Sequence, residues 1–339
     1  MKPPTDWAPV PTLLFATIAG CVAPYDSTVV ARPTQGFPDP WPPPQSTAEA
    51  AHPIDTVGEK KKPSPAWPDV ASKVAGQRDG KRDAAVIVAV EDYAFLPDIP
   101  GAVANGEAWY QYLLHSRGVP RGRIDALFNK RARDAQIRKA VNNAVKLVEP
   151  GGRLWFIFVG HGSASAEHDG LLVGYDAWQS TEGLSDRSVT VPELLRAMSA
   201  PAVNPVVFLD ACFSGLDRQG DPIVPETMPS YEIKTAVPPR VLLLTAAGND
   251  EFAGGLPRAD RPAFSYIALG ALRGWADADG NGTVTAEEVQ QYSEDILRQT
   301  SGSGQTPTIE GQGRRSLARS SEPEPPAINE VLLRIRTER

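Results

Sequence analysis

The sequence predicts an α/β fold in which a mostly parallel sheet is covered by helices on both faces. Short continuous runs of small and β-branched residues, typical of strands buried on both faces, recur along the chain. Segments with apolar residues at helical spacing lie between them, and this alternation is typical of parallel sheets. The chain has 339 residues, of which 41% are hydrophobic and 22% charged, so it can build one large core plus further segments.

The predicted elements follow one another in a regular order. Strands are expected at residues 84–90, 154–159, 206–209 and 241–245, where apolar residues run without interruption. Helices are expected at residues 102–114, 134–148, 191–198, 264–272 and 286–297. The second of these helices has apolar residues at helical intervals from Ile137 to Val148, and Pro150-Gly151-Gly152 stops it. Ligands of such sheets bind at the carboxyl ends of the strands, so the residues just after the strands are the candidates for chemistry.

The first twenty residues have the features of a signal peptide. Residues 13–20 are apolar but too few to span a bilayer as a helix. The run ends in Ile18-Ala19-Gly20-Cys21, which resembles the lipobox of bacterial lipoproteins, although Lys2 is the only basic residue before it. The resemblance implies cleavage before Cys21 and lipidation of its thiol. We therefore expect an exported, membrane-anchored bacterial lipoprotein that faces the periplasm or the cell surface. The alternative is a buried N-terminus with a chance cysteine.

Two further segments differ in composition from the predicted fold. Eleven of the chain's 33 prolines lie between Pro24 and Pro68, so residues 21–83 are expected to be a disordered, proline-rich linker. Residues 314–339 are expected to be a C-terminal tail, which leaves 84–313 as the folded domain. The formal net charge of −7 and the lack of a basic stripe argue against a nucleic-acid partner.

A cysteine and a histidine follow two of the predicted strands. His161 lies between Gly160 and Gly162 directly after the strand at 154–159, and Cys212 follows the strand at 206–209. A nearby imidazole favours the thiolate, which is the nucleophilic form of cysteine. This pattern predicts Cys212 as nucleophile, His161 as its base, and the backbone N–H groups of Gly162 and Cys212 as an oxyanion hole.

Other assignments of these residues remain open. Taken alone, a cysteine after a strand is more often a small buried hydrophobic residue. Cys21 and Cys212 are the only two cysteines, and a disulfide between them is a further alternative. His168 lies just after His161 and is a rival base. We favour His161 because the strand before it holds it in place.

These motifs resemble those of the caspase and metacaspase family. The histidine lies 51 residues before the cysteine, close to the spacing of ~50 in the caspase signature, and the run from Asp210 to Gly215 is similar to the metacaspase pattern. Further similarity, for example at residues 85–93 and 263–274, extends the resemblance over 84–313. The resemblance implies a caspase-like three-layer sandwich with a sheet of about six strands. It also implies a cysteine endopeptidase that acts on protein or peptide substrates.

The resemblance implies a role in substrate binding for Asp210. In the family, the position two residues before the nucleophile lines the pocket for the side chain that precedes the scissile bond. Metacaspases have Asp there and accept Arg or Lys, and a carboxylate can bond a guanidinium through both its oxygens. They usually add a second acid where this chain has Asn105-Gly106, and Glu107 is a possible substitute. We expect cleavage after Arg, then Lys. Alternatively, Asp210 only hydrogen-bonds loop amides.

Residues 277–288 match the calcium-binding loop of EF-hands at every position of its pattern. Carboxylate and amide oxygens fall at positions one, three and five, a backbone carbonyl is available at position seven, and a glutamate closes the loop at position twelve. The implied ligands are Asp277, Asp279, Asn281, Thr283 and Glu288. The match predicts Ca²⁺ as a cofactor that is structural or activating. The alternative is an acidic surface turn.

Taken together, these features predict a calcium-binding cysteine endopeptidase with a Cys–His dyad, tethered to a membrane by an N-terminal lipid. Two other classes remain open: a catalytically silent caspase-like binding module on a surface lipoprotein, and a purely structural lipoprotein with a spacer. The paired motifs around His161 and Cys212 favour the enzyme. The sequence does not indicate the oligomeric state.

Overall fold

The computed structural model of the chain describes residues 67–74, 78–201, 203–216, 221–224, 236–248, 251, 253–300, 305–319 and 328–337. All of them belong to one structural unit, Lys61–Arg339. The predicted signal peptide, Cys21 and most of the predicted linker lie outside the described residues, as does any disulfide to Cys21. Within the part of the chain that is described, no helix is both long and apolar enough to cross a membrane.

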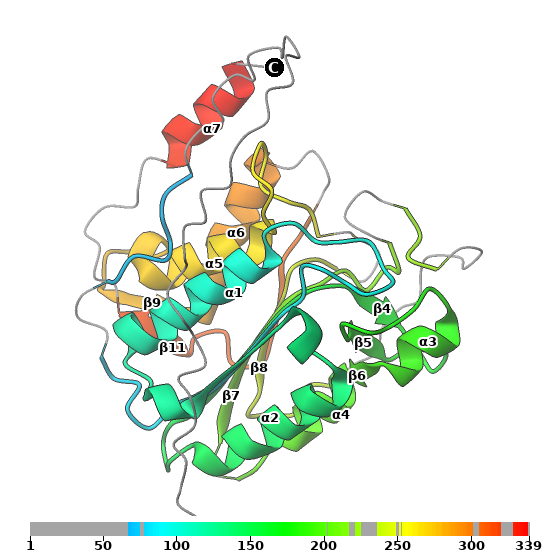
Figure 1. Cartoon of the computed structure of the whole chain (residues 1–339). Helices are drawn as coiled ribbons and strands as arrows, with labels where there is room; N and C mark the ends of the chain where they lie inside the picture. The colour runs from blue at the N-terminus through cyan, green and yellow to red at the C-terminus, as the bar shows by residue number, and fades with distance from the viewer. Residues whose placement is uncertain are drawn as a thin grey trace, which may run out of the picture. The chain divides into compact units, whose positions relative to one another are not determined.

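A six-stranded sheet lies at the centre of this unit (Figure 1). Its strands are β1 Ala84–Ala89, β2 Ile124–Phe128, β3 Arg153–Val159, β7 Asn204–Asp210, β8 Leu242–Thr245 and β10 Thr308–Glu310. The strand order is β10-β8-β7-β3-β1-β2, and all neighbours are parallel except β10, which is antiparallel to β8. Every residue of β1 and β8 is buried. These uninterrupted apolar strands confirm the predicted mostly parallel sheet.

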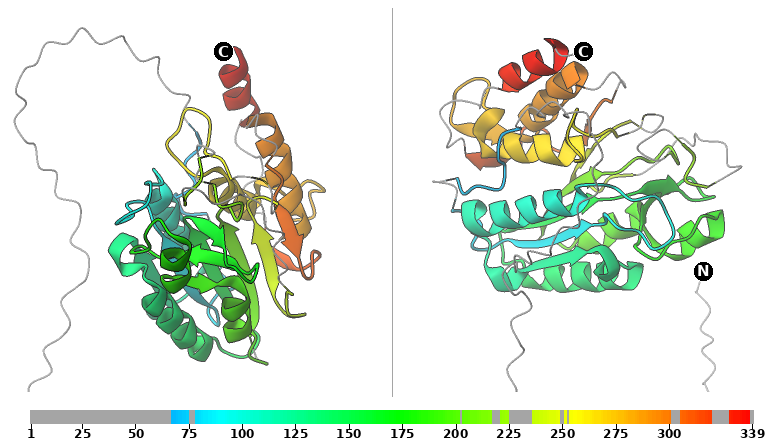
Figure 2. Two further views of the ribbon diagram at one scale, coloured as in Figure 1. Left: turned by 90° about the vertical axis from the view of Figure 1, so that its right-hand side faces the viewer. Right: turned by 45° about the horizontal axis from the view of Figure 1, so that its top comes forward.

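Helices cover both faces of the sheet and complete three layers, as Figures 1 and 2 show. One face carries α1 Ala102–Gln111 and α5 Ala263–Gly270, with α6 Ala286–Thr300 packed against α5. The other face carries α2 Asp134–Leu147 and α4 Val191–Met198. The remaining helical segments are two π turns at Tyr112–Arg117 and Ala271–Trp275, two 3-10 turns at Arg121–Arg123 and Asn129–Arg131, and the helices α3 Thr181–Asp186 and α7 Ile328–Thr337. The predicted three-layer sandwich is therefore confirmed.

Two small sheets add to this framework. β4 Gly162–Ala164, β5 Gly170–Val173 and β6 Ser188–Thr190 form an antiparallel sheet, and only two residues separate β3 from β4. β9 Thr283–Thr285 pairs with β11 Ser316–Arg319. The sequence did not predict these strands, because three or four residues are too few for a hydrophobic period to stand out.

The folded domain extends beyond the predicted bounds of 84–313 at both ends. In the segment before residue 84, Trp67 packs on the core and Val70 is fully buried. The Arg273 guanidinium donates hydrogen bonds to the carbonyl oxygens of Val70 and Ser72. In the segment after residue 313, Leu317 is fully buried in β11, so part of the predicted tail belongs to the fold. Single apolar residues among prolines or polar residues carry no periodic signal, so the sequence pattern does not indicate that these flanking segments pack on the domain.

A buried charge cluster lies at the amino end of the sheet. The Asp83 carboxylate accepts hydrogen bonds from Arg117 Nε, from Trp155 Nε1 and from the backbone N–H of Arg153, each at 2.9 Å. Asp83 and Arg117 are almost fully buried. The Arg153 guanidinium donates to two carbonyl oxygens of β11, and burial lowers the pKa of Arg153 to about 10, which leaves it charged at neutral pH. The cluster therefore joins β11 to β3.

We expect Asp83→Asn to lower the free energy of unfolding by about 3 kcal/mol, because it removes the buried one of the two anionic partners of Arg117 and leaves only the half-exposed Asp79. Urea denaturation measures this change. Asp125→Asn is the matched control, because Asp125 and Arg131 form an exposed ion pair at 3.9 Å. This control should lower the free energy of unfolding by about 1 kcal/mol or less. Equal and small effects of both variants would show that the buried cluster contributes no more than a surface pair.

Candidate active site

The register of the sheet places the two predicted catalytic residues next to each other. β3 and β7 are neighbouring parallel strands, and Val159 pairs with Asp210. His161 follows Val159 by two residues, and Cys212 follows Asp210 by two residues. The backbone N–H of Gly160 donates to the carbonyl oxygen of Asp210 at 3.2 Å, so the two chains stay adjacent beyond the strands. His161 and Cys212 therefore lie side by side at the carboxyl edge of the sheet, each two residues beyond a paired strand residue.

Contacts on two sides hold the imidazole of His161. Its Nε2 lies 2.8 Å from the carbonyl oxygen of Pro97. Because a carbonyl oxygen can only accept, Nε2 carries the proton, and Nδ1 is the basic nitrogen of the neutral ring. The hydroxyl of Tyr93 accepts a hydrogen bond from the His161 backbone N–H at 2.7 Å, and the two ring centroids are 4.8 Å apart. The arrangement fixes the ring and makes Nδ1 the atom that can take a proton.

Neither partner of His161 was assigned a role from the sequence. The contact with Pro97 uses a backbone carbonyl, which any residue type can supply, so no sequence signal marks it. Tyr93 falls in the segment after β1 that resembles the family, but its type alone does not show that it faces the histidine. Both residues become recognisable only once β1 and β3 are paired.

The thiol of Cys212 lies against the backbone of Ala253. The Ala253 N–H donates to Sγ at 2.8 Å, and the Ala253 carbonyl oxygen lies 3.7 Å from Sγ. Cys212 is 5% exposed. The thiol is therefore nearly closed off from solvent, and the backbone of Ala253 is one of its contacts.

The other two candidates near the dyad have different surroundings. Gly162 begins β4, and a Cβ there would lie 2.4 Å from the carbonyl oxygen of Cys212, so only glycine allows this approach. The backbones of Gly162 and Cys212 are therefore in contact, a placement compatible with a shared oxyanion hole. His168 is exposed between β4 and β5 in a left-handed conformation with φ of 67°. Its exposure favours His161 as the base.

Asp210 is fully buried at the end of β7 and belongs to a chain of hydrogen bonds. Its Oδ2 accepts from the backbone N–H of Ser265 at 2.8 Å and from the Ser265 hydroxyl at 2.6 Å. Nδ2 of Asn105 donates to that hydroxyl at 2.7 Å, and Oδ1 of Asn105 accepts from Arg261 Nε at 2.6 Å. Glu107 is exposed, so Asn105 and not Glu107 is the α1 residue connected to Asp210.

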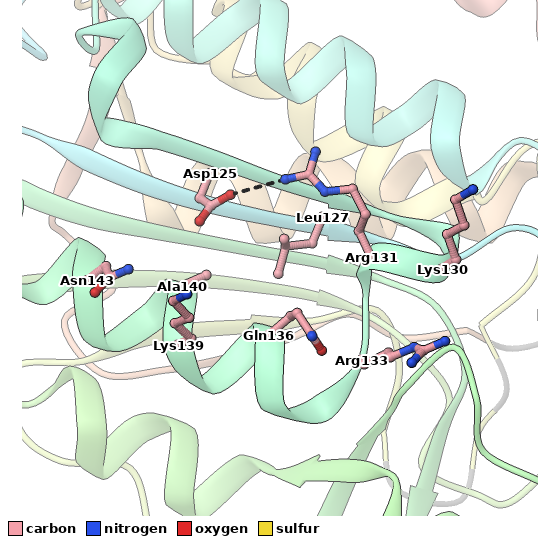
Figure 3. Close-up of a pocket in the computed structure, with 9 residues that line it drawn as sticks. All are labelled: Asp125, Leu127, Lys130, Arg131, Arg133, Gln136, Lys139, Ala140 and Asn143. Atoms are coloured by element: carbon pink, nitrogen blue, oxygen red, sulfur yellow. Dashed lines mark ion pairs between the residues drawn. The ribbon is translucent and has the colours of Figure 1, made fainter. Parts of the chain in front are cut away.

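Two cavities lie near the carboxyl ends of the strands. One of about 330 Å³ lies between β2 and α2 and is lined largely by charged side chains, which Figure 3 shows extending in different directions. The other, of about 210 Å³, lies between Phe213, β8, β10 and the start of α4. Neither of the two is lined by Cys212 or His161.

The predicted calcium loop brings its acidic side chains together. One carboxylate oxygen each from Asp277, Asp279 and Glu288 lie within 4.8 Å of one another. Oδ1 of Asp277 is buried and has no hydrogen-bond partner among the described residues. Gly282, at the sixth position of the loop, has φ of 77°, a conformation that glycine adopts without strain. These features fit a cation at the centre of the loop.

Helical segments and a short strand hold this loop in place. The π turn Ala271–Trp275 precedes it and α6 follows it. The Thr283 N–H donates to Oδ1 of Asn281 at 2.8 Å, and the Glu288 carboxylate accepts from the N–H and the hydroxyl of Thr285. Thr283 also begins β9, which pairs with β11. All five predicted ligands therefore lie in or beside one compact turn.

Comparisons with known proteins show which family the chain belongs to. Similar solved structures include a structural-genomics protein from Geobacter sulfurreducens (16% identity, covering 68% of this chain and 94% of that chain, TM-score 0.49). They also include caspase-1 from Spodoptera frugiperda (13%, 77% and 97%, TM-score 0.48) and the Drosophila initiator caspase Dronc (14%, 80% and 97%, TM-score 0.44). No curated protein matches the chain. The family model for the caspase domain matches residues 82–311, more than half of the chain. Such a domain supports a peptidase-type function, and the chain belongs to the caspase-domain family.

Proposed function

We propose that this protein is a cysteine endopeptidase in which Cys212 is the nucleophile and His161 the general base. The observation that carries the proposal is the register of β3 and β7, which brings Gly160-His161-Gly162 and Cys212 to one edge of the sheet. The hydrogen bond from Nε2 to Pro97 supports it further, because it leaves Nδ1 as the basic nitrogen.

The proposed reaction uses these groups in order. Nδ1 of His161 takes the thiol proton, and the Cys212 thiolate attacks the peptide carbonyl carbon. The backbone N–H groups of Gly162 and Cys212 stabilise the oxyanion that forms. The imidazolium then gives its proton to the leaving amine as the C–N bond breaks. Water, activated by the neutral imidazole, hydrolyses the acyl-enzyme and regenerates the thiol.

We further propose that the peptidase cleaves after basic residues, Arg before Lys, through Asp210. Asp210 is a buried carboxylate two residues before the nucleophile. Its place at the carboxyl end of β7, just before the loop that carries Cys212, supports a role in substrate recognition. A carboxylate in such a position can accept two parallel hydrogen bonds from a guanidinium.

The experiment that tests the peptidase proposal is covalent labelling with an acyloxymethyl ketone peptide that carries Arg next to the reactive group. We expect one label per chain, located on Cys212 by peptide mass mapping. His161→Ala should slow the labelling strongly. If the probe does not label the wild-type protein after its thiol has been made accessible, the silent binding module becomes the better description.

We propose that the loop at 277–288 binds Ca²⁺ through Asp277, Asp279, Asn281, Glu288 and the backbone carbonyl of Thr283. The three clustered carboxylates support this assignment, as does the buried Oδ1 of Asp277, which has no hydrogen-bond partner in the described part of the chain. Oxygen ligands of this kind suit a hard cation, which would stabilise the loop and take no part in the chemistry. Because the loop leads into α6, the ion would fasten that helix to the domain.

Calcium is therefore expected to raise the melting temperature of the protein by several degrees, since a ligand that binds only the native state stabilises it by mass action. Differential scanning fluorimetry with added Ca²⁺ and with a chelator measures the shift. Asp277→Asn should abolish it, whereas Asp295→Asn, which changes a partly exposed acid on α6 outside the loop, should leave it unchanged. Identical melting curves with calcium and with chelator would contradict the site.

We also propose that Cys21 is lipidated and anchors the protein to a membrane. The support is the run Ile18-Ala19-Gly20-Cys21 in the sequence. Two or three acyl chains would hold the protein firmly, at about 0.8 kcal/mol per buried CH₂ group. The intact mass of the mature protein should correspond to a chain that begins at Cys21 and carries diacylglycerol, and Cys21→Ser should leave an uncut precursor. A mature chain that begins at another residue would refute the anchor.

A further inference from the structure

The segment that covers the thiol is anchored near its first residues. We call residues 253–261 the strap. Ala253, its first residue, lies on the Cys212 sulfur. The N–H of Gly254 donates to Oε1 of Gln305 at 3.0 Å, and Nε2 of Gln305 donates to the carbonyl oxygen of the residue after β8 at 2.8 Å. Gln305 is 3% exposed, so both bonds are protected from water.

A second anchor lies just before the strap. The Glu251 carboxylate accepts hydrogen bonds from the Thr306 N–H at 2.6 Å and from the Thr306 hydroxyl at 2.9 Å. It also accepts from the N–H of Gly248 at 3.1 Å. The loop after β8 is therefore bonded to the short segment that follows α6, at Gln305 and at Thr306.

The third anchor is at the far end of the strap. Arg261 donates from Nε to Oδ1 of Asn105 at 2.6 Å and from its terminal nitrogen to the carbonyl oxygen of Ala104 at 3.3 Å. Its guanidinium also lies 5.1 Å from the centre of the Tyr266 ring. The strap is thus fixed to α1 at one end and to the chain after α6 at the other.

We propose that the strap is an autoinhibitory element, which blocks the Cys212 thiol until its anchors release. This inference rests on the proposed peptidase function. A substrate carbonyl must reach Sγ to be attacked, and a backbone N–H at 2.8 Å occupies one approach to that atom. Each anchoring hydrogen bond contributes about 1 kcal/mol, so the closed arrangement dominates, and release shifts the population towards an open, reactive one.

The hydrogen bond from Ala253 to the sulfur could instead raise the reactivity of Cys212, whereas blocking by the strap lowers it. An N–H that donates to sulfur stabilises the thiolate. In that case the strap would activate Cys212, and release of the strap would lower the rate at which Cys212 reacts. The low exposure of Cys212 favours blocking, because a stabilised thiolate that no electrophile reaches does not react. The rate of a simple alkylation therefore decides between them.

The test is the rate at which iodoacetamide modifies Cys212 in the full-length protein at neutral pH, followed by mass spectrometry of the Cys212 peptide. We expect Arg261→Ala and Gln305→Leu each to raise the rate at least tenfold over the wild type. Arg261→Lys, which keeps the charge but loses the planar guanidinium that bonds Asn105 and Ala104, should give an intermediate rate. If Gln305→Leu does not fold, Arg261→Lys still tests the strap, because it is the mildest of the three changes.

The matched control is Gln291→Leu, because Gln291 is an exposed glutamine of α6 whose amide bonds only to a neighbouring side chain on the same helix. It should leave the rate unchanged. An unchanged or lower rate in folded Arg261 variants would overturn the proposal. Alkylation needs no peptidase activity, so faster alkylation without peptide cleavage would support the strap and count against the peptidase.

Discussion

Cys212→Ala is expected to abolish peptidase activity and to leave the fold intact. The register of β3 and β7 brings this thiol to the edge of the sheet where His161 is held, and a hydroxyl is a far weaker nucleophile than a thiolate, so the attack on the peptide carbonyl depends on Cys212. The side chain is small and the change removes only a sulfur, so the free energy of unfolding should change little. Full activity in the Cys212→Ala protein would end the proposal.

His161→Ala is expected to lower kcat by several orders of magnitude, because the thiol then lacks the base that takes its proton. His168→Ala is the matched control, since His168 is exposed in the neighbouring hairpin. It should retain activity close to the wild type. Both proteins should be assayed with a fluorogenic peptide and compared by urea denaturation, which separates a lost base from a damaged fold. Loss of activity in the His168 variant alone would reverse the assignment of the base.

Four strands of the central sheet could be predicted from the sequence because each contains a continuous apolar run. β1, β3, β7 and β8 are continuous apolar runs, and each was expected within a few residues of its bounds. The edge strands could not be predicted. β2 is half-buried and contains Asp125, and β10 has three residues, so neither has the pattern of a strand buried on both faces. Their places follow from pairing with β1 and β8, which the sequence does not reveal.

The candidate site could be predicted only as far as side-chain chemistry marks it. Cys212 and His161 stand out because their types and glycine neighbours are informative. Pro97 and Ala253 act through backbone atoms, whose partners depend on how the loops fold. The cover over the thiol therefore had no sequence signal.

Cleavage after Arg is the last of the large expected effects, and it depends on Asp210. A substrate guanidinium would exchange its hydrogen bonds to water for charge-assisted hydrogen bonds to the buried Asp210 carboxylate. An acidic substrate side chain beside Asp210 would instead bring two negative charges together. We expect a fluorogenic peptide library varied at this position to show Arg first, Lys second and no cleavage after Asp. A difference of about 3 kcal/mol in transition-state binding corresponds to more than 100-fold in kcat/KM.

The structure gives Asp210 a second role, because its Oδ2 accepts two hydrogen bonds from Ser265 near the start of α5. The two roles predict different outcomes for a pair of variants. Asp210→Asn removes the charge, so it should lower kcat/KM for Arg peptides by about 100-fold and weaken the preference over uncharged residues. Ser265→Ala removes one of the two bonds but keeps the charge, so it should lower the free energy of unfolding by about 1 kcal/mol and keep the Arg preference. If Asp210→Asn destabilises the fold and the preference for Arg persists, Asp210 only anchors α5, and specificity for basic residues must come from another group.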